Sequence, residues 1–166
     1  MTGPELVIHL PTKSATRRLA KTLGPLLEPG DLLILGGPLG SGKTFFARAL
    51  CRALGLPSRI RVPSPTFTLV QEYETQPPVS HADVYRLRDS LEVAALGLDS
   101  HRATGRIVLI EWGEPYLVEL GGDALVVVFS FDPRRAALSA TAEKSTKVLQ
   151  KLGRCYNEAS GSRRAQ

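Results

Sequence analysis

The chain has 166 residues, 43% of them hydrophobic, which suits a single globular domain with a sizeable core. No run approaches the roughly 18–20 apolar residues of a membrane span, and residues 1–10 carry Glu5 but no Lys or Arg. We therefore expect neither a membrane segment nor a signal peptide. The two cysteines, Cys51 and Cys155, lack metal-ligand spacing and favour a reducing, cytoplasmic compartment, with Cys51 as a small core residue.

The net charge of +5 is concentrated towards the C-terminus. Residues 134–166 carry eight basic and two acidic side chains, whereas residues 1–133 carry 13 basic and 14 acidic ones. A basic end favours an anionic partner such as RNA. The plainer explanation of this positive charge is a solvent-exposed helix face followed by a flexible tail.

The first predicted elements are a strand over residues 6–10 and an amphipathic helix over residues 14–27. The helix has one apolar face, made by Leu19, Ala20, Leu23, Leu26 and Leu27. Pro29 and Gly30 end this helix and precede the apolar run 31–35, which predicts a buried strand.

Residues 37–44, Gly-Pro-Leu-Gly-Ser-Gly-Lys-Thr, fit G-x-x-x-x-G-K-[ST] at every fixed position. A predicted strand precedes this loop, and a helical apolar period follows over residues 44–54. Glycines let successive N–H groups turn inward, and with the positive helix end they cradle phosphates. The loop predicts a nucleoside triphosphate site, with Lys43 at the β- and γ-phosphates and the Thr44 hydroxyl on Mg²⁺.

The rest of the chain alternates predicted strands and helices. Residues 67–74 and 79–85 are expected to form an antiparallel pair, and residues 90–98 a short helix capped by Ser90. The remaining predicted elements are strands 107–110 and 124–131, a turn at Asp132-Pro133, an edge strand 137–142 and a helix 143–152.

Together these elements predict an α/β fold of the P-loop NTPase kind, with three layers and a mixed, mainly parallel central sheet. Residues 1–152 are predicted to form the ATPase domain, and residues 153–166 a basic, flexible tail.

Four motifs in a fixed order resemble those of the TsaE (YjeE) family. They are LGSGKT at residues 39–44, SPTFTLV at 64–70, HADVYRL at 81–87 and LIEW at 109–112. The resemblance extends over about residues 6–150. It implies a small ATPase that works with TsaB and TsaD to form threonylcarbamoyladenosine (t6A) in tRNA. Its Mg²⁺-dependent ATP hydrolysis would be weak alone and coupled to the partner proteins, and tRNA would be reached through the complex.

The resemblance also implies roles for individual residues. The residues implied to bind ATP are Gly37, Leu39, Gly40, Ser41, Gly42, Lys43, Thr44, Phe45 and Arg134. The implied Mg²⁺ ligands are Thr44 and Glu111. The predicted catalytic residues are Lys43, Glu111 and Thr66, together with Asp83, which is proposed from its own chemistry rather than from the resemblance. Residues 64–66 resemble a switch facing the γ-phosphate. The chain departs from the family at Pro38, where an acidic residue is expected and one backbone N–H is lost, and at Ser41, which replaces a usual Ala.

The residues themselves support part of this assignment. Glu111 ends an apolar strand, which is where a Walker-B-type Mg²⁺ ligand belongs, although a capping or surface carboxylate is the alternative. Asp83 could order a water molecule or the ligands around the metal. A structural role, through a hydrogen bond or a salt bridge to Arg86, fits it equally well. His81 is expected to be a structural histidine. Trp112 fits a partner surface and a core position equally well.

Two other functions fit the phosphate loop. A small-molecule kinase would need a lid, for which Arg86, Arg88, Arg102 and Arg106 are available. A nucleotide-dependent switch would recruit a partner without needing catalysis. Guanine specificity is disfavoured, because the only asparagine is Asn157 and no Asn-Lys-x-Asp element exists.

Overall fold

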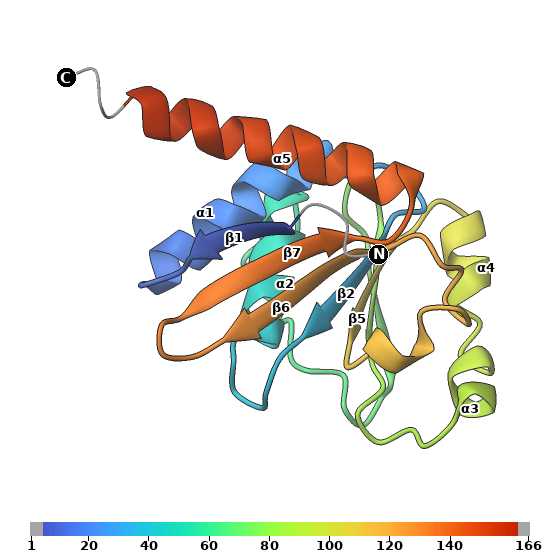
Figure 1. The fold of residues 1–166 in the computed structure, drawn as a ribbon. Helices are drawn as coiled ribbons and strands as arrows, with labels where there is room; N and C mark the ends of the chain where they lie inside the picture. The colour runs from blue at the N-terminus through green and yellow to red at the C-terminus, as the bar shows by residue number, and fades with distance from the viewer. Residues whose placement is uncertain (1–4, 163–166) are drawn as a thin grey trace.

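A seven-stranded sheet runs through the molecule, with helices packed against both of its faces (Figure 1). The computed structural model describes residues 5–162. The strands are β1 Glu5–His9, β2 Leu32–Gly36, β3 Val70–Tyr73, β4 Val79–Asp83, β5 Ile107–Glu111, β6 Leu125–Ser130 and β7 Arg135–Ala140. The helices are α1 Lys13–Leu23, α2 Lys43–Ala53, α3 Ser90–Ala94, α4 Leu98–Ala103 and α5 Glu143–Ser162.

The sheet is parallel in its centre and antiparallel at both ends, in the order β1-β7-β6-β2-β5-β4-β3. Strand β2 pairs parallel with β5 and β6, and β4 pairs parallel with β5. The outer pairs β1–β7, β6–β7 and β3–β4 are antiparallel. This arrangement confirms the predicted α/β fold with a mixed central sheet.

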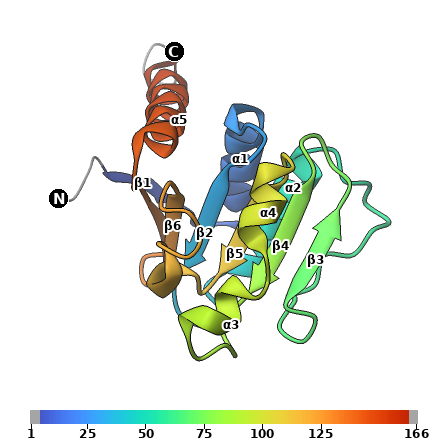
Figure 2. The ribbon, with the colours of Figure 1, turned by 90° about the vertical axis from the view of Figure 1, so that its right-hand side faces the viewer.

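Side chains of the central strands alternate between two separate cores. In β2, Leu33 and Leu35 face the core beneath α1, α2 and α5, while Leu32 and Ile34 face the core beneath α3 and α4. Figure 2 shows α3 and α4 in front of the sheet and α1 behind it. Because both faces are covered, β2 is apolar along its length and β5 is apolar up to Glu111, which explains why both were predicted as buried strands.

Helix α1 is shorter than its apolar pattern predicts. The Thr12 side chain caps it by accepting a hydrogen bond from the Ala15 backbone N–H. The helix ends at Leu23, and the chain then tightens into a 3-10 turn, Gly24–Leu26. Pro25 lacks the N–H that an α-helix would need at this position. The prediction of one helix over residues 14–27 was therefore too long.

Three other expectations were wrong in detail. Strand β7 is not an edge strand, because β1 pairs with its outer side and β6 with its inner side. Asp89, not Ser90, caps α3, since its side chain accepts the Glu92 backbone N–H. The predicted strand 67–74 begins only at Val70, because Leu69 has a left-handed backbone (φ 66°) that interrupts extended structure.

Helix α5 continues to Ser162, so the predicted helix end at Leu152 was wrong. Gly153 lies inside the helix, where a glycine costs about 1 kcal/mol relative to alanine. Burial of Leu152 and packing of Tyr156 against the main core offset that cost. The predicted flexible tail is helical as far as Ser162, and its last residues, 163–166, lie outside the described residues. Within residues 5–162, no helix has the length and apolar character to cross a membrane.

Candidate functional site

The phosphate-binding motif forms the loop between β2 and α2, at the C-terminal end of the parallel strands. Gly37, Gly40 and Gly42 all have left-handed backbones, with φ of 119°, 75° and 107°. A Cβ atom at Gly37 would lie 2.3 Å from the carbonyl oxygen of Phe129, so no larger residue fits there. The glycines of the motif therefore have the conformational role that the sequence predicts.

Lys43 lies buried within this loop. Its Nζ donates hydrogen bonds to the carbonyl oxygens of Gly37 (2.6 Å) and Pro38 (3.0 Å), and it lies 4.0 Å from the ring centroid of Trp112. Burial lowers the pKa of Lys43, although the nearby carboxylates, Glu111 foremost, oppose the shift. The ammonium group thus sits at the opening of the phosphate loop, held only by carbonyl oxygens and an aromatic ring.

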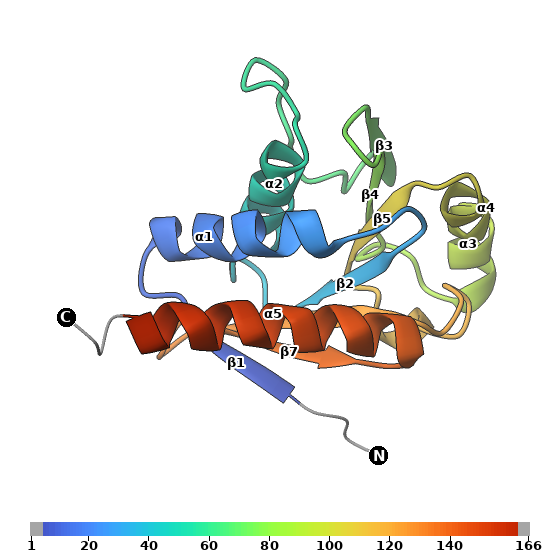
Figure 3. The same ribbon diagram turned by 90° about the horizontal axis from the view of Figure 1, so that it is seen from above.

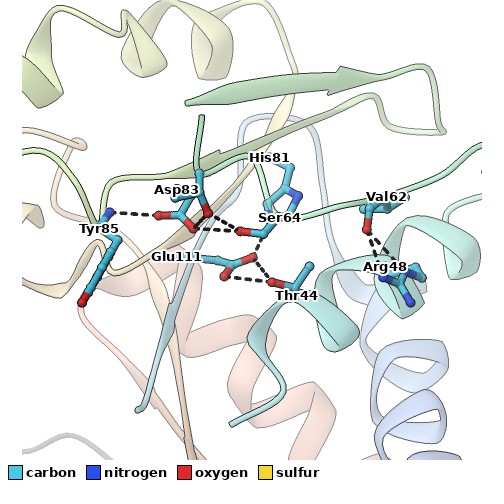
Figure 4. A network of polar contacts seen from close by, with 9 residues as sticks. Thr44, Arg48, Val62, Ser64, His81, Asp83, Tyr85 and Glu111 are labelled. Atoms are coloured by element: carbon cyan, nitrogen blue, oxygen red, sulfur yellow. Dashed lines mark hydrogen bonds and ion pairs between the residues drawn. The ribbon is translucent and has the colours of Figure 1, made fainter. Parts of the chain in front are cut away.

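Glu111 ends β5 and connects three elements around its carboxylate (Figure 4). The Thr44 hydroxyl at the start of α2 lies 2.9 and 3.1 Å from its two oxygens. His81 of β4 places Nε2 2.8 Å from Oε1. The side chain of His81 is fully buried, and its Nδ1 has no hydrogen-bond partner among the described residues. His81 therefore has a hydrogen-bond partner for Nε2 but none for Nδ1 among the described residues. The prediction of a structural histidine with all its hydrogen bonds made is thus met only in part.

Asp83 ends β4 and is the register partner of Glu111 on the adjacent strand. Its Oδ2 accepts hydrogen bonds from the hydroxyls of Ser64 (3.0 Å) and Thr66 (3.2 Å), and Oδ1 accepts the Tyr85 backbone N–H. These hydrogen bonds hold residues 64–66 at the end of β4, and Figure 4 shows Ser64 beside Asp83. No ion pair joins Asp83 to Arg86 in the described part of the chain.

These groups surround one cleft of about 420 Å³. Its lining residues are Leu39, Gly40, Gly42, Lys43, Thr44, Phe45, Ser64, Thr66, Asp83, Tyr85, Glu111 and Trp112. The structure thus brings together every predicted catalytic and metal-binding residue. A carboxylate and a hydroxyl in contact beside a glycine loop form an oxygen donor set of the kind that Mg²⁺ prefers.

Three predicted nucleotide-binding residues lie outside this cleft. Gly37 forms the base of the loop against Phe129. Ser41 and Arg134 instead line a neighbouring hollow of about 180 Å³ on the other side of the loop, where Gly40, Gly42 and Phe45 also contribute. The hydroxyl of Ser41 is buried without a hydrogen-bond partner among residues 5–162. Arg134 is therefore next to the phosphate loop but separate from the Thr44–Glu111 pair.

Two aromatic walls of the cleft were not predicted from the sequence. The rings of Tyr85 and Trp112 pack 4.8 Å apart, and both residues line the cleft. Trp112 is half-buried against the smaller core, so it is neither a pure core residue nor a free surface residue. The sequence position of Trp112, directly after Glu111, could have predicted this placement. A residue next to the carboxylate is expected to lie beside whatever the carboxylate binds.

Two of the four arginines considered for a kinase lid, Arg102 and Arg106, are used elsewhere. Arg102 donates to the carbonyl oxygens of Gly30 and Leu120, and Arg106 donates to those of Tyr73 and Val79. These carbonyls lie away from the cleft, at the opposite end of the parallel strands. Neither arginine lines the cleft, so the structure gives no support to a lid built from this pair.

Comparisons with known proteins identify the family of the chain. The family model described as threonylcarbamoyl adenosine biosynthesis protein TsaE matches residues 10–136. The tRNA threonylcarbamoyladenosine biosynthesis protein TsaE of Bacillus subtilis is 35% identical over 146 residues, covering 86% of this chain and 90% of that protein. The protein of the same name from Streptomyces coelicolor is 40% identical over 113 residues, covering 66% and 74%.

A solved structure shares the fold as well. The crystal structure of YdiB from Bacillus subtilis matches with a TM-score of 0.77 at 28% sequence identity, covering 93% of this chain and 97% of that one. The chain belongs to the TsaE family of tRNA threonylcarbamoyladenosine biosynthesis proteins.

Proposed function

We propose that this member of the TsaE family is the subunit that binds and hydrolyses ATP, with Mg²⁺, in the machinery that forms threonylcarbamoyladenosine in tRNA. The observation that carries the proposal is the contact between Thr44 and Glu111. It joins the first turn of the phosphate-loop helix to a buried carboxylate at the end of a parallel strand. That combination is the Mg²⁺-nucleotide arrangement of P-loop NTPases.

The donor set fits a magnesium ion. The Thr44 and Glu111 oxygens are 2.9 Å apart, a separation that suits neighbouring ligands of an octahedral ion with bonds of about 2.1 Å. No group of three or more His, Cys, Asp or Glu that could hold a metal occurs in the described residues. Mg²⁺ typically uses one or two protein ligands and completes its shell with phosphate oxygens and water. The ion would neutralise charge on the β- and γ-phosphates.

The other cleft residues have separate tasks in this proposal. Lys43 supplies a positive charge to the phosphates when its ammonium leaves the loop carbonyls. Asp83 holds Ser64 and Thr66 at the phosphate end of the cleft, where these hydroxyls and the carboxylate can orient a water molecule. Arg134, which lines the adjacent hollow, is expected to contact the base side of the nucleotide.

Partner proteins are part of the proposal. We expect the chain to act in the cytoplasm with TsaB and TsaD, which would stimulate a weak intrinsic hydrolysis and provide the contact with tRNA. Large apolar side chains support this expectation, because Leu39, Phe67 and Tyr85 are 78%, 82% and 58% exposed on or beside the cleft-lining segments. Exposed apolar residues grouped around a site are typical of a surface that a partner covers.

The decisive experiment measures ATP hydrolysis by the purified chain, alone and with TsaB and TsaD from the same organism. We expect stimulation by the partners. Lys43→Ala should abolish nucleotide binding or hydrolysis, because the loop loses its phosphate-binding cation. Lys151→Ala, which removes an exposed lysine of α5, serves as the matched control and should leave both unchanged.

Two results would contradict the proposal. Hydrolysis that is indifferent to the partners would separate the chain from the tRNA-modifying machinery. Stoichiometric phosphorylation of a compound in a metabolite panel would make the chain a kinase.

A further inference from the structure

The first 71 residues hold a concentration of positive charge that the overall composition hides. No Asp or Glu occurs in residues 6–27 or 32–71. The same stretches contain Lys13, Arg17, Arg18, Lys21, Lys43, Arg48, Arg52, Arg59 and Arg61. Residues 1–133 are nearly neutral as a whole only because their acidic side chains are concentrated further along the chain.

The fold gathers much of this charge on the outer side of α1 and α2. A hollow of about 310 Å³ between these helices is lined by Arg17 and Lys21 from α1, by Arg48 and Arg52 from α2, and by the apolar side chains of Phe45 and two alanines of α2. A second hollow, of about 440 Å³, shares Arg48 and Arg52 and adds Arg61 from the segment after α2. The two hollows therefore adjoin along Arg48 and Arg52, and we refer to them together as the basic groove, defined by these five residues. Figure 3 shows α1, α2 and the segment that follows α2 on one side of the molecule.

Two arginines of the basic groove are fixed in place. Arg48 donates two hydrogen bonds to the carbonyl oxygen of Val62. Arg52 donates to the carbonyl oxygens of Leu56 and Pro57. These contacts tie the segment after α2 to the helix and so hold Arg61 beside the groove. Carbonyl oxygens carry no net charge, so both guanidinium groups keep their full positive charge.

The groove has no acidic counterpart. None of its five basic residues forms an ion pair in the described part of the chain, and Lys21 and Arg61 are exposed. By contrast, Lys144 pairs with Asp31 and Lys147 pairs with Glu143. Unpaired like charges repel one another, and this arrangement is stabilised when an anionic ligand spans them.

We propose that the basic groove binds the phosphodiester backbone of RNA. Several guanidinium groups along the basic groove suit a chain of phosphates, which arginine binds through paired hydrogen bonds. The core of a protein interface is normally apolar and depleted of charge. Phe45, which lines the first hollow, is partly buried, and Ile60, next to Arg61 in the chain, is only 38% exposed, which disfavours a protein partner here. This inference goes beyond the proposed function, which requires only the cleft.

The groove adjoins the nucleotide cleft. Phe45 lines both, and the segment that Arg48 holds at Val62 continues directly to Ser64. RNA in the groove would therefore lie against α2, whose first residues are Lys43 and Thr44. This placement would bring RNA close to the ATP site without occupying it.

The test measures binding of a fluorescein-labelled, unmodified tRNA transcript to the full chain by anisotropy, without partner proteins, over a series of salt concentrations. The groove variant Lys21→Glu/Arg61→Glu reverses two exposed charges that lie outside the cleft. Lys151→Glu/Arg154→Glu makes the same charge change on α5 and is the matched control. We expect the groove variant to bind at least about tenfold more weakly and to lose about one to two units of the slope of log affinity against log salt. The control should lose much less.

The result can contradict the inference in three ways. An equal loss in both double variants would mean that only net charge matters. A groove variant that binds like the unmodified chain would remove the groove from the RNA site. Competition by polyglutamate as effective as that by unlabelled RNA would point to an acidic protein instead. ATP hydrolysis and thermal unfolding of the same groove variant should be unchanged, which separates failure of this inference from failure of the proposed function.

Discussion

Carboxylates lie at both ends of the parallel strands, but their partners differ. At the C-terminal ends, Glu111 is bonded to Thr44 and His81, and Asp83 mainly to two hydroxyls. No Lys or Arg forms an ion pair with either carboxylate in the described residues.

At the opposite ends, each carboxylate meets positive charge or a helix N-terminus. Asp31 precedes β2 and pairs with Lys144 Nζ at 2.7 Å. Asp123 precedes β6 and accepts the backbone N–H groups of Lys144 and Ser145, at the start of α5, at 3.0 and 2.9 Å. Asp123 thus acts as a cap for a helix that begins 20 residues later in the chain.

The difference indicates which carboxylates stabilise the fold and which serve a ligand. A buried carboxylate whose charge is compensated within the protein gains nothing from an added cation. Asp83 and Glu111 are each 3% exposed and have no Lys or Arg ion-pair partner in the described residues, so a bound cation would relieve an unfavourable burial. Substitutions at the two ends should therefore separate activity from stability.

The largest effect is expected for Glu111→Ala. Loss of the proposed Mg²⁺ ligand should reduce Mg²⁺-dependent ATP turnover by at least about 100-fold, on the order of 3 kcal/mol, and nucleotide affinity by much less. Steady-state hydrolysis and equilibrium binding of a fluorescent ATP analogue measure the two quantities. Glu111→Gln keeps the size of the side chain and should be nearly as inactive. Normal hydrolysis by Glu111→Ala would remove this residue from the site.

A smaller loss, about tenfold in turnover, is expected for Asp83→Asn, because a neutral amide is a weaker acceptor for the hydroxyls of Ser64 and Thr66 than a carboxylate. The double variant Ser64→Ala/Thr66→Val removes the same hydrogen bonds and should reproduce the loss in the same assay. If the double variant were fully active, Asp83 would not act by positioning this segment.

Asp123→Ala is expected to have the smallest effect on activity. It should instead lower the stability of the fold. Loss of the α5 cap should lower the free energy of unfolding by about 1 kcal/mol while leaving turnover unchanged. Urea unfolding measures the difference, and Glu119→Ala, at an exposed position, is the control that should cost little.

The stability difference at Asp123 should depend on pH. Burial alone would raise the pKa of Asp123, but hydrogen bonds from Ser145 and Lys144 outweigh it and lower the pKa below the ordinary value of 3.8. The stabilisation is therefore complete above pH 3.8 and is lost as the pH falls through the folded-state pKa. A difference between the two proteins that persists undiminished at about pH 2 would contradict the capping role.

The sequence predicted well what local patterns determine. The glycine loop between an apolar run and a helical period located the phosphate site, and the apolar run before Glu111 located the buried carboxylate. Each signal is confined to one short stretch of the chain, residues 31–54 and 107–111, so it can be recognised without knowledge of the fold.

The features that were missed depend on distant contacts. The position of β7 inside the sheet depends on β1, which is far away in the sequence. The length of α5 depends on Leu152 and Tyr156 meeting the core. Arg102 and Arg106 were equally suited to a lid until the structure showed their carbonyl partners. The basic groove was hidden because a net charge averaged over 133 residues does not report where the charges gather.

Trp112 gives the protein a built-in optical reporter. It is the only tryptophan in the chain, and its ring forms a wall of the cleft with the ammonium group of Lys43 4.0 Å from its centroid. A charge held over an indole ring alters its emission, so any movement of Lys43 away from the ring changes the light emitted. The tryptophan fluorescence of the whole protein therefore comes from one wall of the cleft. Occupancy of the cleft can be followed without attaching a dye, even in mixtures with unlabelled RNA.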